Sequence, residues 1–131
     1  SRFMRIDFYA IVTRFQTEPL QLVCRLCEKA FNAGQPAAVL VDDLETAEAL
    51  DQLLWEFNPE AFVPHQIAGD EDDEHTAILI VPPGAPLAPR PLWINLREDP
   101  APDGPARLIE LIPADDAAKV AARQRWRAYQ A

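Results

Sequence analysis

The chain has 131 residues and a formal net charge of −9 at pH 7, and 49% of its residues are hydrophobic while 25% are charged. This balance excludes a disordered chain and fits one globular domain, residues 1–131, with a sizeable core. A pI near 4.6 disfavours non-specific binding to nucleic acid, which requires an excess of Lys and Arg. No apolar run reaches the ~18–20 residues of a membrane span and no signal peptide is recognisable, so we expect a cytoplasmic protein. Residues 1–3, before Met4, are interpreted as a cloning remnant.

The chain begins with a strand-like and then a helix-like segment. Residues 5–13 are rich in β-branched and aromatic residues, which predicts a strand. Residues 17–33 carry apolar residues at helical spacing, with Thr17 as the expected N-cap and Gly34 as the C-terminal stop. A strand followed by an amphipathic helix is the first half of a parallel α/β unit.

A second strand and helix follow directly. The continuous apolar run 36–41 predicts a strand that is buried on both faces. Asp42 or Asp43 is expected to cap a helix that ends near Trp55. The apolar residues of this helix, beginning with Leu44, are expected to face the core. Strands alternating with helices at this spacing predict a single-domain, three-layer α/β fold. Its mostly parallel sheet is flanked by helices and is similar to nucleotide-binding domains without a phosphate loop.

The second half of the chain contains three more predicted strands, residues 77–81, 92–96 and 107–112, separated by Pro-rich loops. Residues 57–69 are interpreted as a turn-rich crossing, in which His65 is a turn or core histidine rather than a base. Residues 70–74 (DEDDE) are interpreted as a solvated loop, because they lack the spaced oxygen ligands and central Gly of a calcium loop. Residues 114–130 form the last predicted helix.

Several catalytic and cofactor motifs are missing from this sequence. No Gly-rich phosphate loop follows the first strand, and the only serine is Ser1, which excludes a nucleophile elbow. Cys24 and Cys27 spell C-x-x-C, but they lie within a helical pattern and lack two further ligands with zinc spacing. We interpret them as buried, reduced cysteines. A binding role without a cofactor or metal is therefore favoured over catalysis.

The last helix carries an unusual charge pattern for an acidic chain. Lys119, Arg123 and Arg127 recur at four-residue steps, each of which rotates only about 40°, so they form one stripe. Trp126 lies one turn after Arg123, on the neighbouring part of that stripe. The segment carries four cations, including Arg125, against two aspartates. From the pattern alone a solvated helix face is the commoner explanation, although a short acidic ligand with an apolar anchor would also suit it.

Residues 22–69, LVCRLCEKAFNAGQPAAVLVDDLETAEALDQLLWEFNPEAFVPHQIAG, and residues 121–130, AARQRWRAYQ, resemble the chi subunit family of bacterial DNA polymerase III holoenzyme. The resemblance is weaker across residues 82–106. It implies an α/β fold without nucleotide hydrolysis and a non-catalytic role in the clamp-loader assembly of the replisome. It also implies that DNA is reached only indirectly, through two protein partners. One is the psi subunit and the other is the acidic, Pro-Phe-ending tail of single-stranded-DNA-binding protein.

The resemblance also implies which residues bind these partners. The tail-binding residues fall on the last predicted strand and the last helix, and they are Ile112, Lys119, Arg123, Trp126 and Arg127. Arg can grip carboxylates in a bidentate manner, and Trp offers an apolar platform for the terminal Phe. Trp126-Arg127 stands where relatives often carry Tyr-Lys. With this fit, tail binding becomes the favoured explanation of the stripe.

The psi-facing residues fall on Trp55 and Phe62, which could equally be ordinary core aromatics. Two rival functions also stay open. One is a degenerate nucleotide-binding or thiol-redox enzyme acting through Cys24 and Cys27. The other is a direct binder of single-stranded nucleic acid that uses the cationic stripe and Trp126 as a stacking platform.

Overall fold

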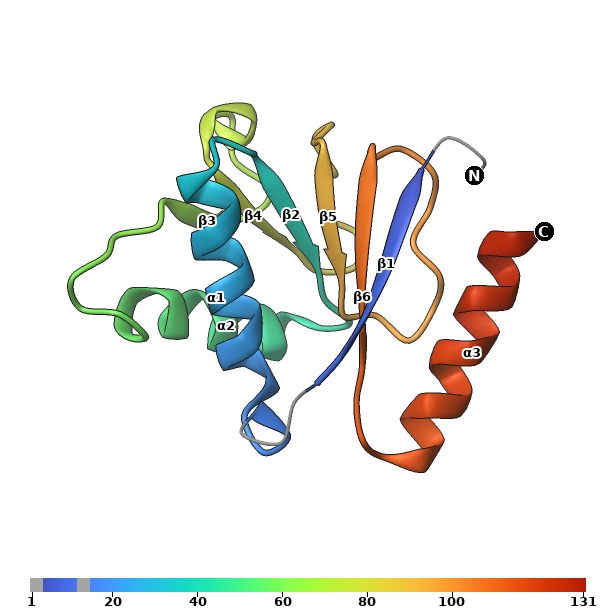
Figure 1. Cartoon of the computed structure of the whole chain (residues 1–131). Helices are drawn as coiled ribbons and strands as arrows, with labels where there is room; N and C mark the ends of the chain where they lie inside the picture. Colours follow the sequence, from blue (N-terminus) through green and yellow to red (C-terminus); the bar gives the residue numbers. More distant parts are fainter. Residues whose placement is uncertain (1–3, 12–14) are drawn as a thin grey trace.

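The protein is an α/β domain with a six-stranded, all-parallel sheet, as seen in a computed structural model that describes residues 4–11 and 15–131 (Figure 1). The strand order is β1-β6-β5-β2-β4-β3. The described elements, in chain order, are β1 (Arg5–Ala10), α1 (Pro19–Asn32), β2 (Ala37–Leu40), α2 (Leu44–Glu56), β3 (His65–Ile67), a 3-10 turn η2 (Asp73–His75), β4 (Ile78–Val81), β5 (Leu92–Asn95), β6 (Arg107–Ile112) and α3 (Asp116–Gln130). The predicted fold class is confirmed.

The sheet separates two apolar layers. Alternate strand residues such as Val39 and Ile94 pack with the buried residues of α1 and α2 on one face. The residues between them, such as Leu40 and Trp93, form the second layer with the Pro-rich loops and with Tyr129 of α3. All residues of β2, β4 and β5 are buried, as expected of parallel strands covered on both faces. In Figure 1, α3 stands beside β1 and β6, apart from α1 and α2.

The region between α2 and β4 contains more regular and buried structure than the sequence predicts. The crossing predicted for residues 57–69 contains β3, which pairs with β4 at the sheet edge through His65↔Ile78 and its two successors. β3 has only three residues, all half-buried, so it lacks the apolar run that identifies the other strands. The predicted solvated loop 70–74 is also partly wrong. Asp73 is buried, and its carboxylate is satisfied there by hydrogen bonds that it accepts from the backbone N–H of Gly69 and Asp70.

The helix ends agree with the sequence in part. Asp43 caps α2 by accepting from Thr46 N (2.7 Å), and Gly34 ends α1 with a φ of 68°, both as predicted. Thr17 is not the cap of α1, which begins at Pro19, after Glu18, whose side chain makes no capping hydrogen bond. Leu44 was expected to face the core, but it is 56% exposed in the first turn of α2.

The remaining boundaries differ by a few residues. α3 begins at Asp116 rather than residue 114, because Asp115 is the N-cap and accepts from Ala118 N (2.9 Å). Residues 1–3, and residues 12–13 at the end of the first predicted strand, lie outside the described residues. Within the described ranges, no helix combines the length and the apolar character that a bilayer crossing requires.

Candidate functional site

A hollow of about 350 Å³ lies where α3 passes over the edge of the sheet. We call it the α3 groove, and it is lined by Phe8, Ile112, Lys119, Ala122, Arg123 and Trp126. The groove follows from the topology, because edge strand β1 pairs with β6 in a register that places Ala10 opposite Ile112. The small side chain of Ala122 is buried under the helix, which leaves room for apolar ligand atoms beside it.

The groove brings together four of the five tail-binding residues that the sequence suggested: Ile112, Lys119, Arg123 and Trp126. Trp126 is 50% exposed, and both cations are exposed. Within the part of the chain that the structure describes, neither Lys119 nor Arg123 forms an ion pair or a hydrogen bond through its side chain. The α3 groove is therefore an apolar hollow bordered by two cations that have no partner among the described residues.

Arg127, the fifth predicted residue, is exposed but does not line the groove. The stripe turns about 40° at every four-residue step, so Arg127 lies about 80° around the helix from Lys119, beyond the residues that border the hollow. Phe8 lines the groove and was missed by the sequence reasoning. Its strand is predictable, whereas the pairing of β1 with β6, a hundred residues later, cannot be read from a local pattern.

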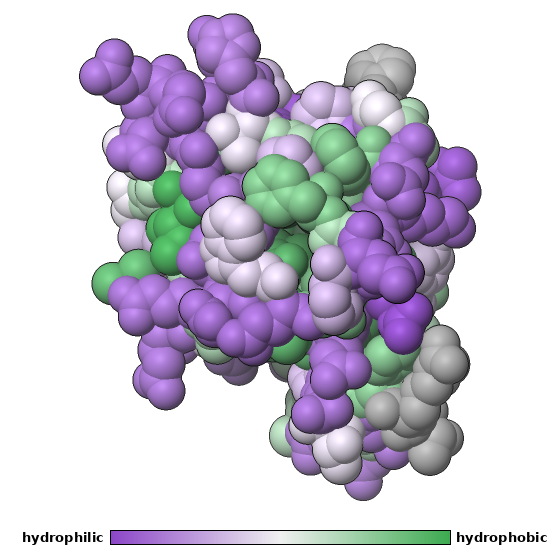
Figure 2. All heavy atoms as spheres, turned by 90° about the vertical axis from the view of Figure 1, so that its left-hand side faces the viewer, coloured by the Kyte–Doolittle hydropathy of each residue, from purple (hydrophilic) through white to green (hydrophobic). Residues whose placement is uncertain are grey.

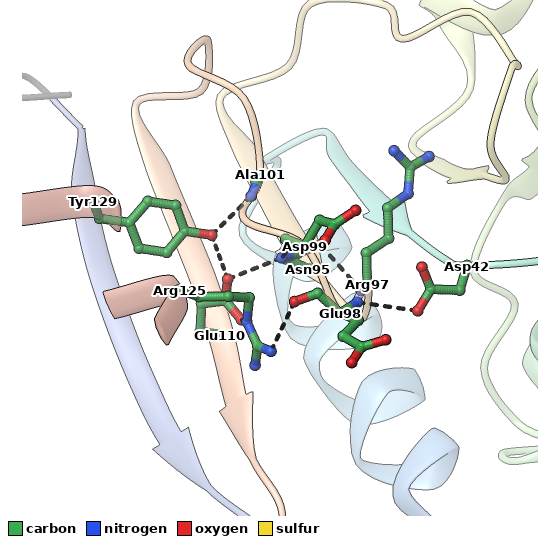
Figure 3. A network of polar contacts seen from close by, with 9 residues as sticks. All are labelled: Asp42, Asn95, Arg97, Glu98, Asp99, Ala101, Glu110, Arg125 and Tyr129. Carbon is green, nitrogen blue, oxygen red and sulfur yellow. Dashed lines mark hydrogen bonds and ion pairs between the residues drawn. The ribbon is translucent and has the colours of Figure 1, made fainter. Parts of the chain in front are cut away.

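A buried polar network holds α3 in this orientation (Figure 3). Arg125 donates from Nε to Glu110 Oε1 (3.0 Å), and Glu110 also accepts from Asn95 Nδ2 (2.9 Å) and from the hydroxyl of Tyr129. Glu110 is fully buried and Arg125 is 7% exposed. Burial, together with the hydrogen bond to Glu110, raises the pKa of Tyr129. The network therefore fixes the helix rotation that turns Trp126 and Arg123 toward the groove.

This network corrects the interpretation of one cation. Arg125 was counted with the positive charges of the last helix, but its charge is neutralised inside the protein by Glu110. A signal for this pair was present in the sequence. Glu110 is the one polar residue within the apolar run 108–112, LIELI, and a buried carboxylate requires a partner.

A second surface is formed by two exposed aromatic side chains at the end of α2 and in the crossing that follows. Trp55 and Phe62 are 55% and 59% exposed, and their rings stack with centroids 5.2 Å apart. His65 supports them from beneath, edge-on to Trp55 at 5.0 Å, with its side chain fully buried. Figure 2 views the molecule from this side and shows apolar atoms at the surface among hydrophilic side chains.

The chemistry of the two cysteines argues against a reactive thiol. Both side chains are buried against the core under α1, as predicted. Burial raises the pKa of Cys24 to about 12 and also raises that of Cys27, so neither is a thiolate at neutral pH. Among the described residues, no three His, Cys, Asp or Glu side chains are grouped so that they could hold a metal ion.

Comparisons with known proteins agree on one family. The family model described as DNA polymerase III chi subunit, HolC, matches residues 3–131. A Pseudomonas aeruginosa protein named DNA polymerase III subunit chi is 36% identical over 129 residues, which is 96% of this chain and 89% of the relative. Proteins of the same name from Haemophilus influenzae and Escherichia coli are 29% and 30% identical, covering 92% and 84% of this chain and 86% and 77% of the relatives.

Proposed function

This chain belongs to the family of DNA polymerase III chi subunits, and we propose that it is a non-catalytic adaptor linking the clamp-loader assembly to single-stranded-DNA-binding protein. Its ligand at the α3 groove is the acidic C-terminal tail of that protein, which ends in Pro-Phe. The observation that carries the proposal is the combination of uncommitted cations and an apolar hollow in one place.

The two halves of the groove suit the two halves of such a tail. Arg123 and Lys119 offer charge-assisted hydrogen bonds to the carboxylates of the acidic residues and of the chain end. The apolar wall made by Phe8, Ile112 and Trp126 suits the ring of the terminal Phe. Arg127, outside the groove, adds positive potential beside it.

The acidic character of the rest of the chain favours a protein tail over bare nucleic acid. The net charge of −9 repels a long polyphosphate, whose charges extend beyond the groove. A short tail places its charges within about one Debye length of Arg123 and Lys119, where they are attracted locally. Binding should therefore weaken as salt is added, and a bare oligonucleotide should bind poorly.

The first experiment is a calorimetric titration of a short acidic peptide ending in Asp-Pro-Phe into the full chain at two salt concentrations. We expect micromolar binding that weakens with salt and is lost in Arg123→Glu. Arg25→Glu, on α1 on the opposite face of the sheet, changes the net charge equally and should bind like the wild type. Equal binding of Arg123→Glu would place the tail site elsewhere, and tighter binding of an oligonucleotide than of the peptide would favour direct DNA binding.

A psi-like subunit is the proposed second partner, at the surface formed by Trp55 and Phe62. Exposed, stacked aromatic rings are typical of residues that contribute most to a protein interface. This surface lies at the β3 side of the sheet, whereas the α3 groove lies at the β1 side, so both partners can bind together.

A further inference from the structure

A cavity lies at the carboxyl edge of the sheet, outside both proposed partner surfaces. It has a volume of about 460 Å³, within the range typical of ligand sites. Its walls are mostly apolar and come from α1, from the ends of β5 and β6 and from the alanines of α3. They include Leu20, Val23, Leu96, Leu111 and Ala121. We call it the carboxyl-edge cavity.

Its position follows from the topology. β2 and β5 are neighbours in the sheet, yet the chain leaves β2 toward β3 and leaves β5 toward β6, in the opposite direction. The two connections diverge and leave a crevice between them, which is where open α/β sheets bind their ligands. Asp42, after β2, and Glu98, after β5, both line the cavity.

The charges around this cavity do not suit a phosphate. The N-terminus of α2 is already capped by Asp43 and that of α3 by Asp115. Arg97 donates to the carbonyl oxygens of Val41 (3.0 Å) and Val81 (2.8 Å), so its guanidinium is committed to the ends of β2 and β4. The two helix N-termini and the Arg97 guanidinium, which could otherwise bind the phosphates of a nucleotide, thus already donate hydrogen bonds to acceptors within the chain.

The negative groups at the mouth of the cavity are available. Asp42 and Glu98 are exposed, and the backbone N–H of Glu98 donates to Asp42 Oδ2 at 3.0 Å, which keeps the two residues adjacent. Figure 3 shows the side chains of Arg97 and Glu98 leaving the chain in opposite directions, and among the described residues the two form no ion pair with each other. An apolar cavity with two carboxylates at its mouth attracts a cation that carries an apolar group.

We infer that the carboxyl-edge cavity binds a segment of a protein partner in which a large apolar side chain lies next to Lys or Arg. The apolar side chain enters between α1 and α3, and the cation pairs with Asp42 and Glu98. The alanines of α3 that line this cavity, such as Ala121, lie on the side of the helix away from Lys119 and Arg123. This partner and an acidic tail in the α3 groove therefore contact opposite sides of the same helix and do not compete for side chains.

The test uses ¹⁵N-labelled full chain and two matched peptides, acetyl-Lys-Phe-Lys-amide and acetyl-Glu-Phe-Glu-amide. We expect the basic peptide at millimolar concentrations to shift the backbone amide signals of Leu20, Thr46 and Leu96, which line the cavity, in a saturable manner, and the acidic peptide to leave them unchanged. Equal shifts with both peptides, or no shift with the basic one, would overturn the inference.

Two variants separate the contribution of charge from that of the cavity. The double variant Asp42→Asn/Glu98→Gln should lower the affinity for the basic peptide roughly five-fold or more. The control Glu48→Gln/Glu60→Gln, which removes the same charge elsewhere on the surface, should leave this affinity unchanged. Ala121→Phe fills the cavity and should abolish the shifts while the rest of the amide spectrum stays dispersed. Full binding by Ala121→Phe with a folded spectrum would show that the peptide binds outside the cavity.

Discussion

The guanidinium of Arg125 and the carboxylate of Glu110 form a buried ion pair, with 3.0 Å between Nε and Oε1. Arg125 lies on α3 and Glu110 on β6, so the pair ties the helix to the strand beneath it. Arg125 also donates from Nη1 to the carbonyl oxygen of Glu98 (3.2 Å), which extends the connection to the loop after β5. The pair therefore determines which residues of α3 face the sheet and which face the α3 groove.

Removal of one partner of this pair should destabilise the protein strongly. Arg125→Met leaves the Glu110 carboxylate buried without its countercharge, so we expect the free energy of unfolding to fall by about 3–5 kcal/mol. Chemical denaturation at pH 7 measures this change. Arg123→Met, an exposed change two residues away, should alter stability by less than about 0.5 kcal/mol. Equal effects of the two variants would contradict the structural role of the pair.

The hydroxyl of Tyr129 should give the protein a stability that disappears at alkaline pH. It donates to Glu110 and accepts from the backbone N–H of Ala101 (2.8 Å). Burial, helped by the hydrogen bond to Glu110, raises the pKa of Tyr129 above its ordinary value near 10. Between the two values the unfolded chain has lost the proton that the folded chain keeps, so stability falls as the pH rises through this range.

Tyr129→Phe tests this expectation, because it removes the hydroxyl and keeps the ring. We expect the variant to be about 1.5–3 kcal/mol less stable than the wild type at pH 7, as for hydrogen bonds to charged groups. Denaturation curves at several pH values should show this difference shrinking above about pH 10. A difference that stays constant up to alkaline pH would show that the phenol ionises equally in both states.

The sequence predicts most of the fold because its elements are locally encoded. The buried strands β2 and β4 are continuous apolar runs, β5 is apolar up to Asn95, and α2 carries an apolar stripe after a recognisable cap, Asp43. β3 escapes prediction because its three residues are half-buried and its pairing with β4 depends on the rest of the sheet. The spacing places Lys119, Arg123 and Trp126 on one side of the last helix, but only the family resemblance identified them as candidate binding residues.

The rest of the candidate site depends on contacts between distant segments. Phe8 reaches the groove only because β1 pairs with β6, and no local pattern reveals that pairing. Arg127 belongs to the sequence stripe but not to the groove, because only the packing of α3 on the sheet decides where the stripe leaves the hollow. The burial of Arg125 likewise depends on the position of Glu110 beneath it.

Arg123 and Arg127 should differ in their effect on tail binding. Arg123 lines the α3 groove and Arg127 does not, so Arg123→Glu should weaken the acidic peptide by more than about ten-fold and Arg127→Glu by only a few-fold. The difference should persist at moderate salt, because contact pairs are screened less than distant charges. Titrations of the acidic peptide into both variants at two salt concentrations measure this difference. A larger loss of affinity in Arg127→Glu than in Arg123→Glu would indicate that the tail binds on the part of α3 that carries Arg127.

Phe8 should contribute to the apolar part of the same site. Phe8→Ala removes one wall of the groove, and we expect a roughly ten-fold loss of affinity for the peptide ending in Asp-Pro-Phe. A double-mutant cycle that combines Phe8→Ala with a peptide ending in Asp-Pro-Ala tests direct contact. The losses of binding free energy from the two changes should be non-additive if the two rings are in contact. Simple additivity would show that Phe8 does not contact the terminal ring of the peptide.

The exposed aromatic surface should be more important for partner binding than for folding. Phe62 is 59% exposed, so Phe62→Ala should cost less than about 1 kcal/mol of unfolding free energy. Leu54→Ala, one residue before Trp55 and 1% exposed, should cost about 2–5 kcal/mol and serves as the buried control. Thermal or chemical denaturation compares the two variants.

The same variants then distinguish a docking surface from a structural cluster. If a psi-like subunit covers Trp55 and Phe62, either alanine variant should lose about 2 kcal/mol or more of binding energy to it, because stacked aromatics at the centre of an interface are typical hot spots. The affinity for the acidic tail peptide should stay unchanged, since the α3 groove lies at the opposite edge of the sheet. A loss of stability in Phe62→Ala comparable to that of Leu54→Ala would assign these aromatics to the core and leave the partner surface to be found elsewhere.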